Sequence, residues 1–114
     1  MSHTEAFLAQ QIIKTINTEL QVDLRSSKRT RELVYMRYVC YHVIRKRFPL
    51  LTLIAIGNLF NKDHATVIHG LEMYESLKNY DDFAQIERKV METVKYYPKN
   101  SNVLCNPMVY EKNV

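Results

Sequence analysis

The sequence has few of the residues that interrupt regular secondary structure, with two glycines and three prolines among 114 residues. Together with a hydrophobic fraction of 46%, this scarcity excludes a disordered chain and predicts a folded, largely helical protein. The two cysteines, Cys40 and Cys105, form neither a metal-binding spacing nor a disulfide framework. We expect Cys40 to be a buried apolar residue within a helix.

Long apolar runs are also missing. No segment approaches the length that crosses a bilayer, and the N-terminal segment has Gln10, Gln11 and Lys14 where a signal peptide is apolar. These absences predict a cytoplasmic protein that does not contact a membrane. No Walker lysine motif, nucleophile elbow or paired-carboxylate signature is present, so we expect no catalysis, no cofactor and no small-molecule substrate.

Positive charge is concentrated in one part of the chain. The net charge is only +4, but eight basic residues and a single acidic one lie between Arg25 and Arg47. That segment therefore carries +7 and the remaining chain −3. A positive patch on a small, otherwise acidic body is typical of proteins that bind a phosphate backbone. A solvated charged surface is the plainer alternative.

The spacing of apolar residues predicts an all-α protein with a single modest core. An amphipathic helix is expected over residues 4–20, followed by a polar loop over 21–30. A second helix over 31–48 must stop at Pro49, which cannot donate the next helical hydrogen bond. The inner face of that helix is expected to hold Leu33, Met36, Cys40, Val43, Ile44 and Arg47.

A further helix is expected near the end of the chain. Asp81 or Asp82 supplies its cap and Pro98 ends it. The residues after Pro98 have no apolar period and are expected to form a tail. The inner face of this last helix is expected to hold Phe83, Ile86, Val90 and Val94.

Residues 52–74 have the pattern of two short helices joined by a tight turn, which indicates a helix-turn-helix. Thr52 is expected to cap the first helix, and Asn61-Lys62 to form the turn. Asp63 is expected to cap the second helix, where its charge suits the positive end of the helix dipole. Because residues advance by about 100° around a helix, the second helix has one face that packs against the core and one face that is free. The packing face holds Val67, Leu71 and Tyr74, and the free face holds Ala65, His69, Glu72 and Ser76.

Two separate segments resemble a known family. Residues 53–69 contain L-I-A-I-G-N-L-F followed by K-D-H-A-T-V-I-H, and residues 26–40 are S-S-K-R-T-R-E-L-V-Y-M-R-Y-V-C. Both are similar to the duplex-binding C-terminal domain (domain IV) of the bacterial replication initiator DnaA. Its signature is I-G-x-x-F, a turn and R-D-H-[TSA]-T-V-[LI]-H, with a basic loop upstream. The resemblance covers residues 20–94 and implies a compact helix-turn-helix domain of the DnaA domain IV or Trp-repressor-like type.

The resemblance also implies which residues contact DNA. By the ungapped match, Arg31 is the loop residue that enters the minor groove, where an arginine favours A·T-rich sequence. Lys28 and Arg29 would neutralise phosphates nearby, and Asp63 and His64 would contact base edges. The full expected set is Lys28, Arg29, Arg31, Arg37, Lys62, Asp63, His64, Ala65, Thr66 and His69.

Some of these residues have plainer interpretations. Asp63 can be an N-cap alone, and the Thr66 hydroxyl can bond back to its own helix. A zinc site at His64 and His69 is disfavoured because a separation of five places them on different helix faces.

Four features depart from the family pattern. Met36 stands where the family has proline, and Tyr38 where it has glutamine. The Asn61-Lys62 turn is shorter than the usual Gly-Gly-Arg. Ala65 replaces a frequent threonine and can touch a thymine methyl but cannot hydrogen-bond. The DNA site therefore need not be the family's consensus.

These observations predict an N-terminal amphipathic helix over residues 1–22, a DNA-binding domain over 23–97 and a tail over 98–114. We expect a nucleoid-associated phage, plasmid or mobile-element protein that binds double-stranded DNA at initiator-type sites, in replication or in transcription. One alternative is a dimeric helix-turn-helix regulator. Another is a protein-binding adaptor that does not bind DNA. A homodimer or a host replication protein is a further expected partner.

Overall fold

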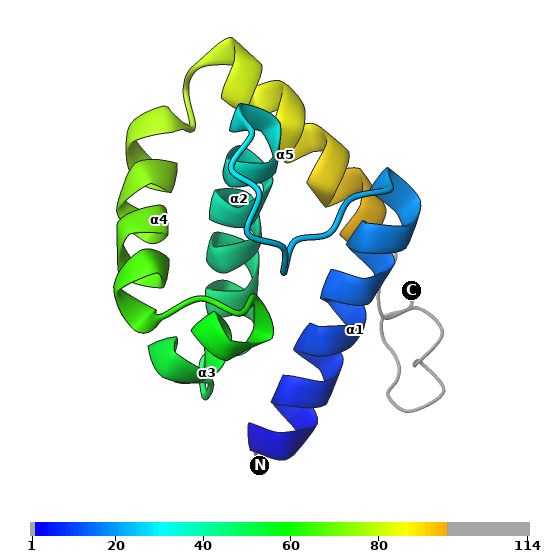
Figure 1. Cartoon of the computed structure of the whole chain (residues 1–114), viewed down its shortest axis with the longest axis vertical. Coiled ribbons are helices and arrows are strands. Elements are labelled where there is room, and N and C mark those ends of the chain that lie inside the picture. The colour runs from blue at the N-terminus through cyan, green and yellow to red at the C-terminus, as the bar shows by residue number, and fades with distance from the viewer. Residues whose placement is uncertain (1, 96–114) are drawn as a thin grey trace.

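The computed structural model describes residues 2–95, which form five α-helices and, within that range, no strand. In chain order these are α1 (Ser2–Leu20), α2 (Arg31–Arg47), α3 (Leu53–Leu59), α4 (His64–Leu77) and α5 (Asp81–Val94) (Figure 1). The all-α prediction is confirmed. None of these five helices has the length and apolar character needed to cross a membrane.

Helix α2 lies at the centre of a single hydrophobic core. It packs against α4 and α5, while α1 packs along α5 and α3 (Figure 1). Ile12 and Ile16 of α1 are almost fully buried, so α1 shares its core with the other helices. The largest fully buried side chains in the middle of this core include Tyr41, Phe60 and Phe83.

Most of the predicted inner faces are buried. On α2 every predicted apolar residue is buried, but Arg47, which the spacing placed with them, is exposed. On α5 the predicted face is buried at Phe83, Val90 and Val94 and half-buried at Ile86. The cysteine prediction is confirmed for Cys40, which is buried and free, whereas Cys105 lies outside the described residues.

The predicted cap of the last helix is wrong. Helix α5 begins at Asp81 with Tyr80 as its N-cap, and no side chain closes a cap hydrogen bond there. Asp81 and Asp82 lie in the first turn, where their charges still favour the positive end of the helix dipole. The expected stop at Pro98 and the predicted tail lie outside the described residues.

Candidate nucleic-acid interface

The two helices of the helix-turn-helix begin at side-chain caps, as predicted. Thr52 Oγ1 accepts a hydrogen bond of 3.0 Å from the backbone N–H of Ala55 at the start of α3. Asp63 Oδ1 accepts from the backbone N–H of Thr66 at 2.9 Å and from its hydroxyl at 2.8 Å. These bonds hold the pKa of the Asp63 carboxyl below its ordinary value. Each cap satisfies a backbone donor that the helix itself leaves free.

The turn between the helices is tight for two local reasons. Asn61 adopts a left-handed φ of 60°, a conformation that asparagine tolerates better than most residues. The backbone N–H of Lys62 then donates to the carbonyl of Gly57 at 2.8 Å. A Cβ on Gly57 would lie 2.5 Å from the carbonyl oxygen of Lys62, so the turn requires glycine at this position.

Arg37 of α2 holds the basic loop, residues 21–30, through hydrogen bonds from its guanidinium. Its Nε donates to the Leu24 carbonyl at 2.9 Å, and its two terminal nitrogens donate to the carbonyls of Lys28 at 2.8 Å and Ser26 at 2.7 Å. The residue is only 4% exposed, and burial lowers the pKa of its guanidinium. Arg37, which the resemblance placed among the residues that contact DNA, therefore has its guanidinium buried and bonded to the loop carbonyls.

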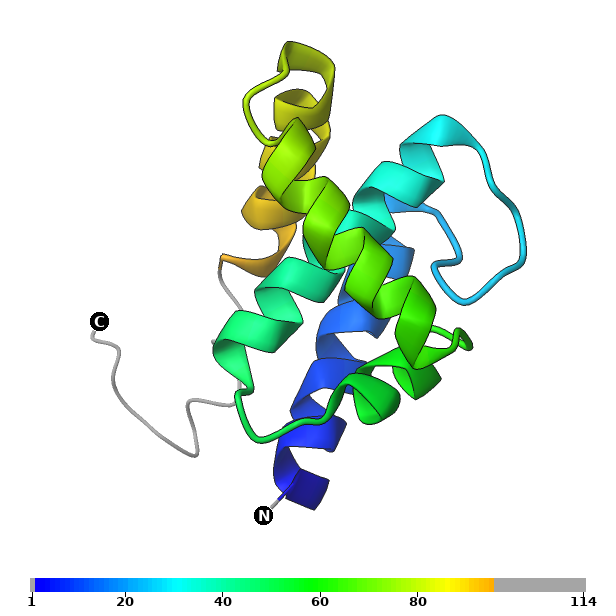
Figure 2. The same ribbon diagram turned by 90° about the vertical axis from the view of Figure 1, so that its left-hand side faces the viewer.

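Three further hydrogen bonds join this loop to the helix-turn-helix. The Lys62 ammonium donates to the Ser26 carbonyl at 2.8 Å. From the loop, Arg25 donates to the carbonyls of Asn58 and Leu59, both at 3.0 Å, at the C-terminal end of α3. The loop and the N-terminal end of α4 consequently lie on the same side of the molecule (Figure 2).

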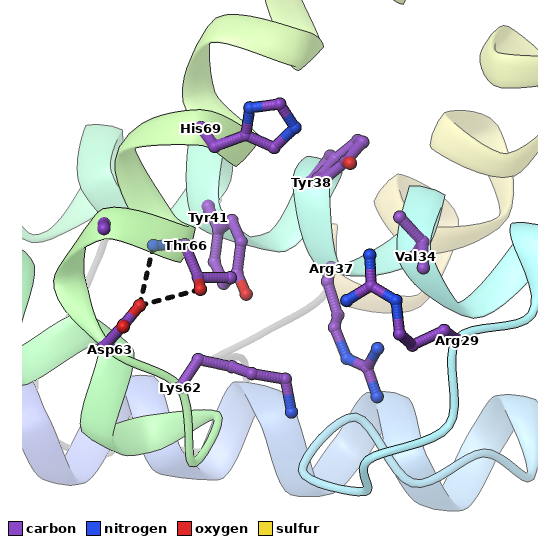
Figure 3. Close-up of a pocket in the computed structure, with 10 residues that line it drawn as sticks. Arg29, Val34, Arg37, Tyr38, Tyr41, Lys62, Asp63, Thr66 and His69 are labelled. Carbon is purple, nitrogen blue, oxygen red and sulfur yellow. Dashed lines mark hydrogen bonds between the residues drawn. The ribbon is translucent and has the colours of Figure 1, made fainter.

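Between the loop and α4 lies a pocket of about 280 Å³. It contains seven of the ten residues predicted to contact DNA, together with three residues of α2 (Figure 3). The predicted residues are Arg29, Arg37, Lys62, Asp63, Ala65, Thr66 and His69, and the residues of α2 not predicted are Val34, Tyr38 and Tyr41.

The other three predicted residues lie outside this pocket. Arg31 is the first residue of α2, where it forms an exposed ion pair with Asp82 and its guanidinium lies 5.3 Å from the ring centroid of Tyr35. Lys28 is exposed on the loop, and His64 is exposed at the first position of α4. The structure thus brings Arg29, and not Arg31, beside α4.

Positive charge dominates the pocket. Partial burial lowers the pKa of Lys62, and the nearby charges of Arg37, Arg29 and Arg25 lower it further. Asp63 is the single acidic residue of the lining. Within residues 2–95 the side chains of Lys28 and Arg29 have no ion-pair or hydrogen-bond partner, so both charges are available to a ligand.

The residues expected to contact DNA did not include Val34, Tyr38 and Tyr41 of α2, and the role of Arg25 was not predicted. A signal for Tyr41 was present, because Arg37 and Tyr41 are four residues apart and therefore share a helix face. No sequence signal indicated that Arg25 would bond to α3. No group of three or more metal-ligating side chains occurs among the residues that the structure describes, His64 and His69 included.

A short, partly buried helix, a tight turn and a second helix with an exposed N-terminal end, flanked by a cationic loop, define a helix-turn-helix domain of the nucleic-acid-binding class. Residues 9–73 match the family described as the bacterial dnaA protein helix-turn-helix. The chain belongs to this family. Membership supports binding of double-stranded DNA by the domain.

Curated relatives agree with the family match. The chromosomal replication initiator protein DnaA of Caldanaerobacter subterraneus subsp. tengcongensis is 32% identical over 95 residues, which cover 82% of this chain and 21% of the relative. DnaA of Thermoanaerobacter sp. strain X514 is 37% identical over 76 residues, covering 67% of this chain and 16% of the relative. The chain thus spans about a fifth of the length of the relatives it matches. No solved structure matches it significantly.

Proposed function

We propose that this chain binds double-stranded DNA in a sequence-specific manner, with the N-terminal end of α4 in the major groove and the basic loop over the adjacent minor groove. The observation that carries the proposal is the pocket, because one face holds both an exposed helix N-terminus and the loop with its unpaired cations. Neutralised phosphates would supply most of the affinity, and base contacts from α4 the specificity.

The exposure of each side chain suggests its role. His64, Ala65 and His69 are exposed on α4 and available to base edges. Asp63 uses one carboxylate oxygen as the helix cap and keeps the other for a cytosine amino group. Lys28 is free to neutralise a phosphate.

We assign the minor-groove contact to Arg29 in place of Arg31. Arg29 lines the pocket beside α4, whereas Arg31 is paired with Asp82 and lies over Tyr35. We expect Arg29→Ala to weaken binding to A·T-flanked duplexes more than to G·C-flanked ones, because only the narrow A·T groove favours an inserted arginine. Arg31→Ala should weaken both equally, and fluorescence anisotropy with the two duplexes measures the difference. An A·T-selective loss in Arg31→Ala alone would return the assignment to Arg31.

The decisive experiment is selection of bound duplexes from a random pool, followed by affinity measurements at several salt concentrations. We expect a defined motif, and His64→Ala should relax the preference at one base pair by about 1–3 kcal/mol. Absence of any enriched motif, or of duplex binding at moderate salt, would contradict the proposal and favour the protein-binding adaptor.

The replication role rests on the relatives, which are named chromosomal replication initiator proteins. We infer that the chain acts in the nucleoid, at initiator-type sites, as a replication or regulatory protein of a phage, plasmid or other mobile element. A motif like the initiator's own would support this, and an unrelated motif would contradict it.

The number of chains bound per DNA site distinguishes the proposed function from that of a dimeric regulator. One chain per site is expected here, whereas a regulator would form a dimer on half-sites about one helical turn apart. Sedimentation with and without duplex distinguishes the two.

A further inference from the structure

The Tyr41 hydroxyl is a buried polar group without a partner. Tyr41 is fully buried on α2, where its ring packs edge-on against Phe60 with centroids 4.8 Å apart and lies beneath Gly70 of α4. Its hydroxyl has no hydrogen-bond partner among the described residues. Buried hydroxyls are normally paired, because leaving one unpaired costs free energy. An unpaired hydroxyl in the wall of a pocket therefore indicates a ligand that pairs with it.

The surroundings of this hydroxyl favour an anion. Arg29, Arg37 and Lys62 line the same pocket, and their mutual repulsion contributes to the lowered pKa of Lys62. An anion placed among them would relieve that repulsion. The opposing group is the Asp63 carboxylate, which is outnumbered by the three cations and has one oxygen bonded to Thr66.

Tyr41 can serve this anion only as a donor. Burial raises the pKa of Tyr41 to about 12, so its phenol keeps the proton at neutral pH. The 14-residue helix α4 begins beside it and adds the positive end of its dipole. A phosphate group fits this set of donors and charges, and the pocket of about 280 Å³ is large enough to admit it.

We propose that the pocket is a subsite for one phosphate group of the bound duplex, in which the Tyr41 hydroxyl donates to a phosphate oxygen and Lys62 supplies positive charge. This assignment rests on the proposed DNA binding. Lys62 and Tyr41 face the same space (Figure 3), and the Lys62 ammonium is held by the Ser26 carbonyl.

The variant Tyr41→Phe removes the hydroxyl and leaves the ring. It should be at least as stable as the parent chain, because it deletes an unpaired buried group. Its affinity for the selected duplex should fall about tenfold, the effect of one hydrogen bond to a charged oxygen. Anisotropy titrations should show the same loss for a scrambled duplex and an unchanged salt slope, because a phenol carries no charge.

Tyr80→Phe is the matched control, because Tyr80 is exposed at the start of α5 and does not line the pocket. Its duplex affinity should equal that of the parent chain. Equal affinity in Tyr41→Phe would overturn the phosphate subsite and leave the proposed function standing. A loss confined to the selected duplex would also overturn it, because it would indicate a base contact.

Inorganic phosphate tests the pocket without DNA. Thermal unfolding of the parent chain should shift upwards in phosphate relative to chloride at equal ionic strength, and Tyr41→Phe should lose that shift. If no duplex binds but this Tyr41-dependent shift persists, the proposed function fails and the pocket remains a site for a free phosphate group. If neither the shift nor duplex binding depends on the hydroxyl, the subsite is refuted.

Discussion

The Lys62 ammonium donates to the carbonyl oxygen of Ser26 at 2.8 Å, and so joins the helix-turn-helix to the basic loop across 36 residues of sequence. The same ammonium lies 3.4 Å from the Phe60 carbonyl. Lys62 therefore helps to set the distance between the two surfaces expected to contact DNA, in addition to carrying a charge.

Replacement of Lys62 by methionine keeps much of the side-chain volume and removes the charge. We expect weaker binding to all duplexes and a salt slope shallower by about one unit, because one phosphate contact is lost. Lys14→Met is the control, since Lys14 is exposed on α1 and absent from the pocket lining. Titrations at several salt concentrations measure both slopes, and an identical slope in Lys62→Met and the parent chain would contradict the phosphate contact.

Replacement of Arg37 should act on stability first. In Arg37→Met the carbonyls of Leu24, Ser26 and Lys28 lose their donor, so the free energy of unfolding should fall by about 2–4 kcal/mol. Arg37→Lys should recover little of this loss, because one ammonium cannot match the planar set of donors. Urea denaturation measures both variants. A loss in Arg37→Met no larger than in Lys28→Met, at an exposed loop position, would refute the structural role.

Gly70 is a packing position on α4. A Cβ there would lie 2.4 Å and 2.6 Å from two ring carbons of Tyr41, which is fully buried and cannot move aside. Gly70→Ala should therefore destabilise the domain by about 1–3 kcal/mol, although alanine is the better helix former. Ser76→Ala, at an exposed position of α4, is the control and should change stability little. Chemical denaturation measures the free energy of unfolding of both variants. A Gly70→Ala variant more stable than the parent chain would contradict the close contact.

The Asp63 cap should make stability depend on pH in acid. Its hydrogen bonds to Thr66 hold the pKa of the folded carboxyl below the ordinary value of 3.8. A lowered folded pKa contributes stability that is present above 3.8 and is lost as the pH falls through the folded pKa. Asp63→Ala should therefore unfold at a lower temperature than the parent chain at neutral pH, and the difference should shrink in strong acid.

Asp63→Asn separates the cap from its charge. Asparagine caps a helix about as well as aspartate but does not titrate. Thermal melts followed by circular dichroism across the acid range measure all three proteins. A difference between Asp63→Ala and the parent chain that stays constant with pH would exclude a stabilising role for the charge.

Much of the fold could be predicted because its signals are local. The caps at Thr52 and Asp63 and the turn at Asn61 depend on bonds between residues at most a few positions apart. The buried faces of α2 and α5 follow from helical period alone. The prediction for the cap of α5 is wrong because Asp81 and Asp82 are both good cap residues, and the sequence does not show that the helix already begins at Asp81, with Tyr80 as its N-cap.

The residues of the candidate site could be predicted only in part, because their side chains bond to partners that are distant in sequence. The sequence does not distinguish the arginines between Arg25 and Arg37, yet in the structure three of them lie in different environments. Arg37 is buried beneath the loop, Arg31 pairs with Asp82, and Arg29 faces the pocket. Spacing along the chain cannot distinguish these outcomes, which depend on how the helices pack.

The sequence by itself determined the helices, the tight turn and the family, because period, capping and motif are properties of short segments. Only the tertiary structure decided which charges remain available and that the Tyr41 hydroxyl is buried without a partner. The physical reason is that a hydrogen bond requires two groups within about 3 Å, and for residues tens of positions apart only the packing of the core sets that distance.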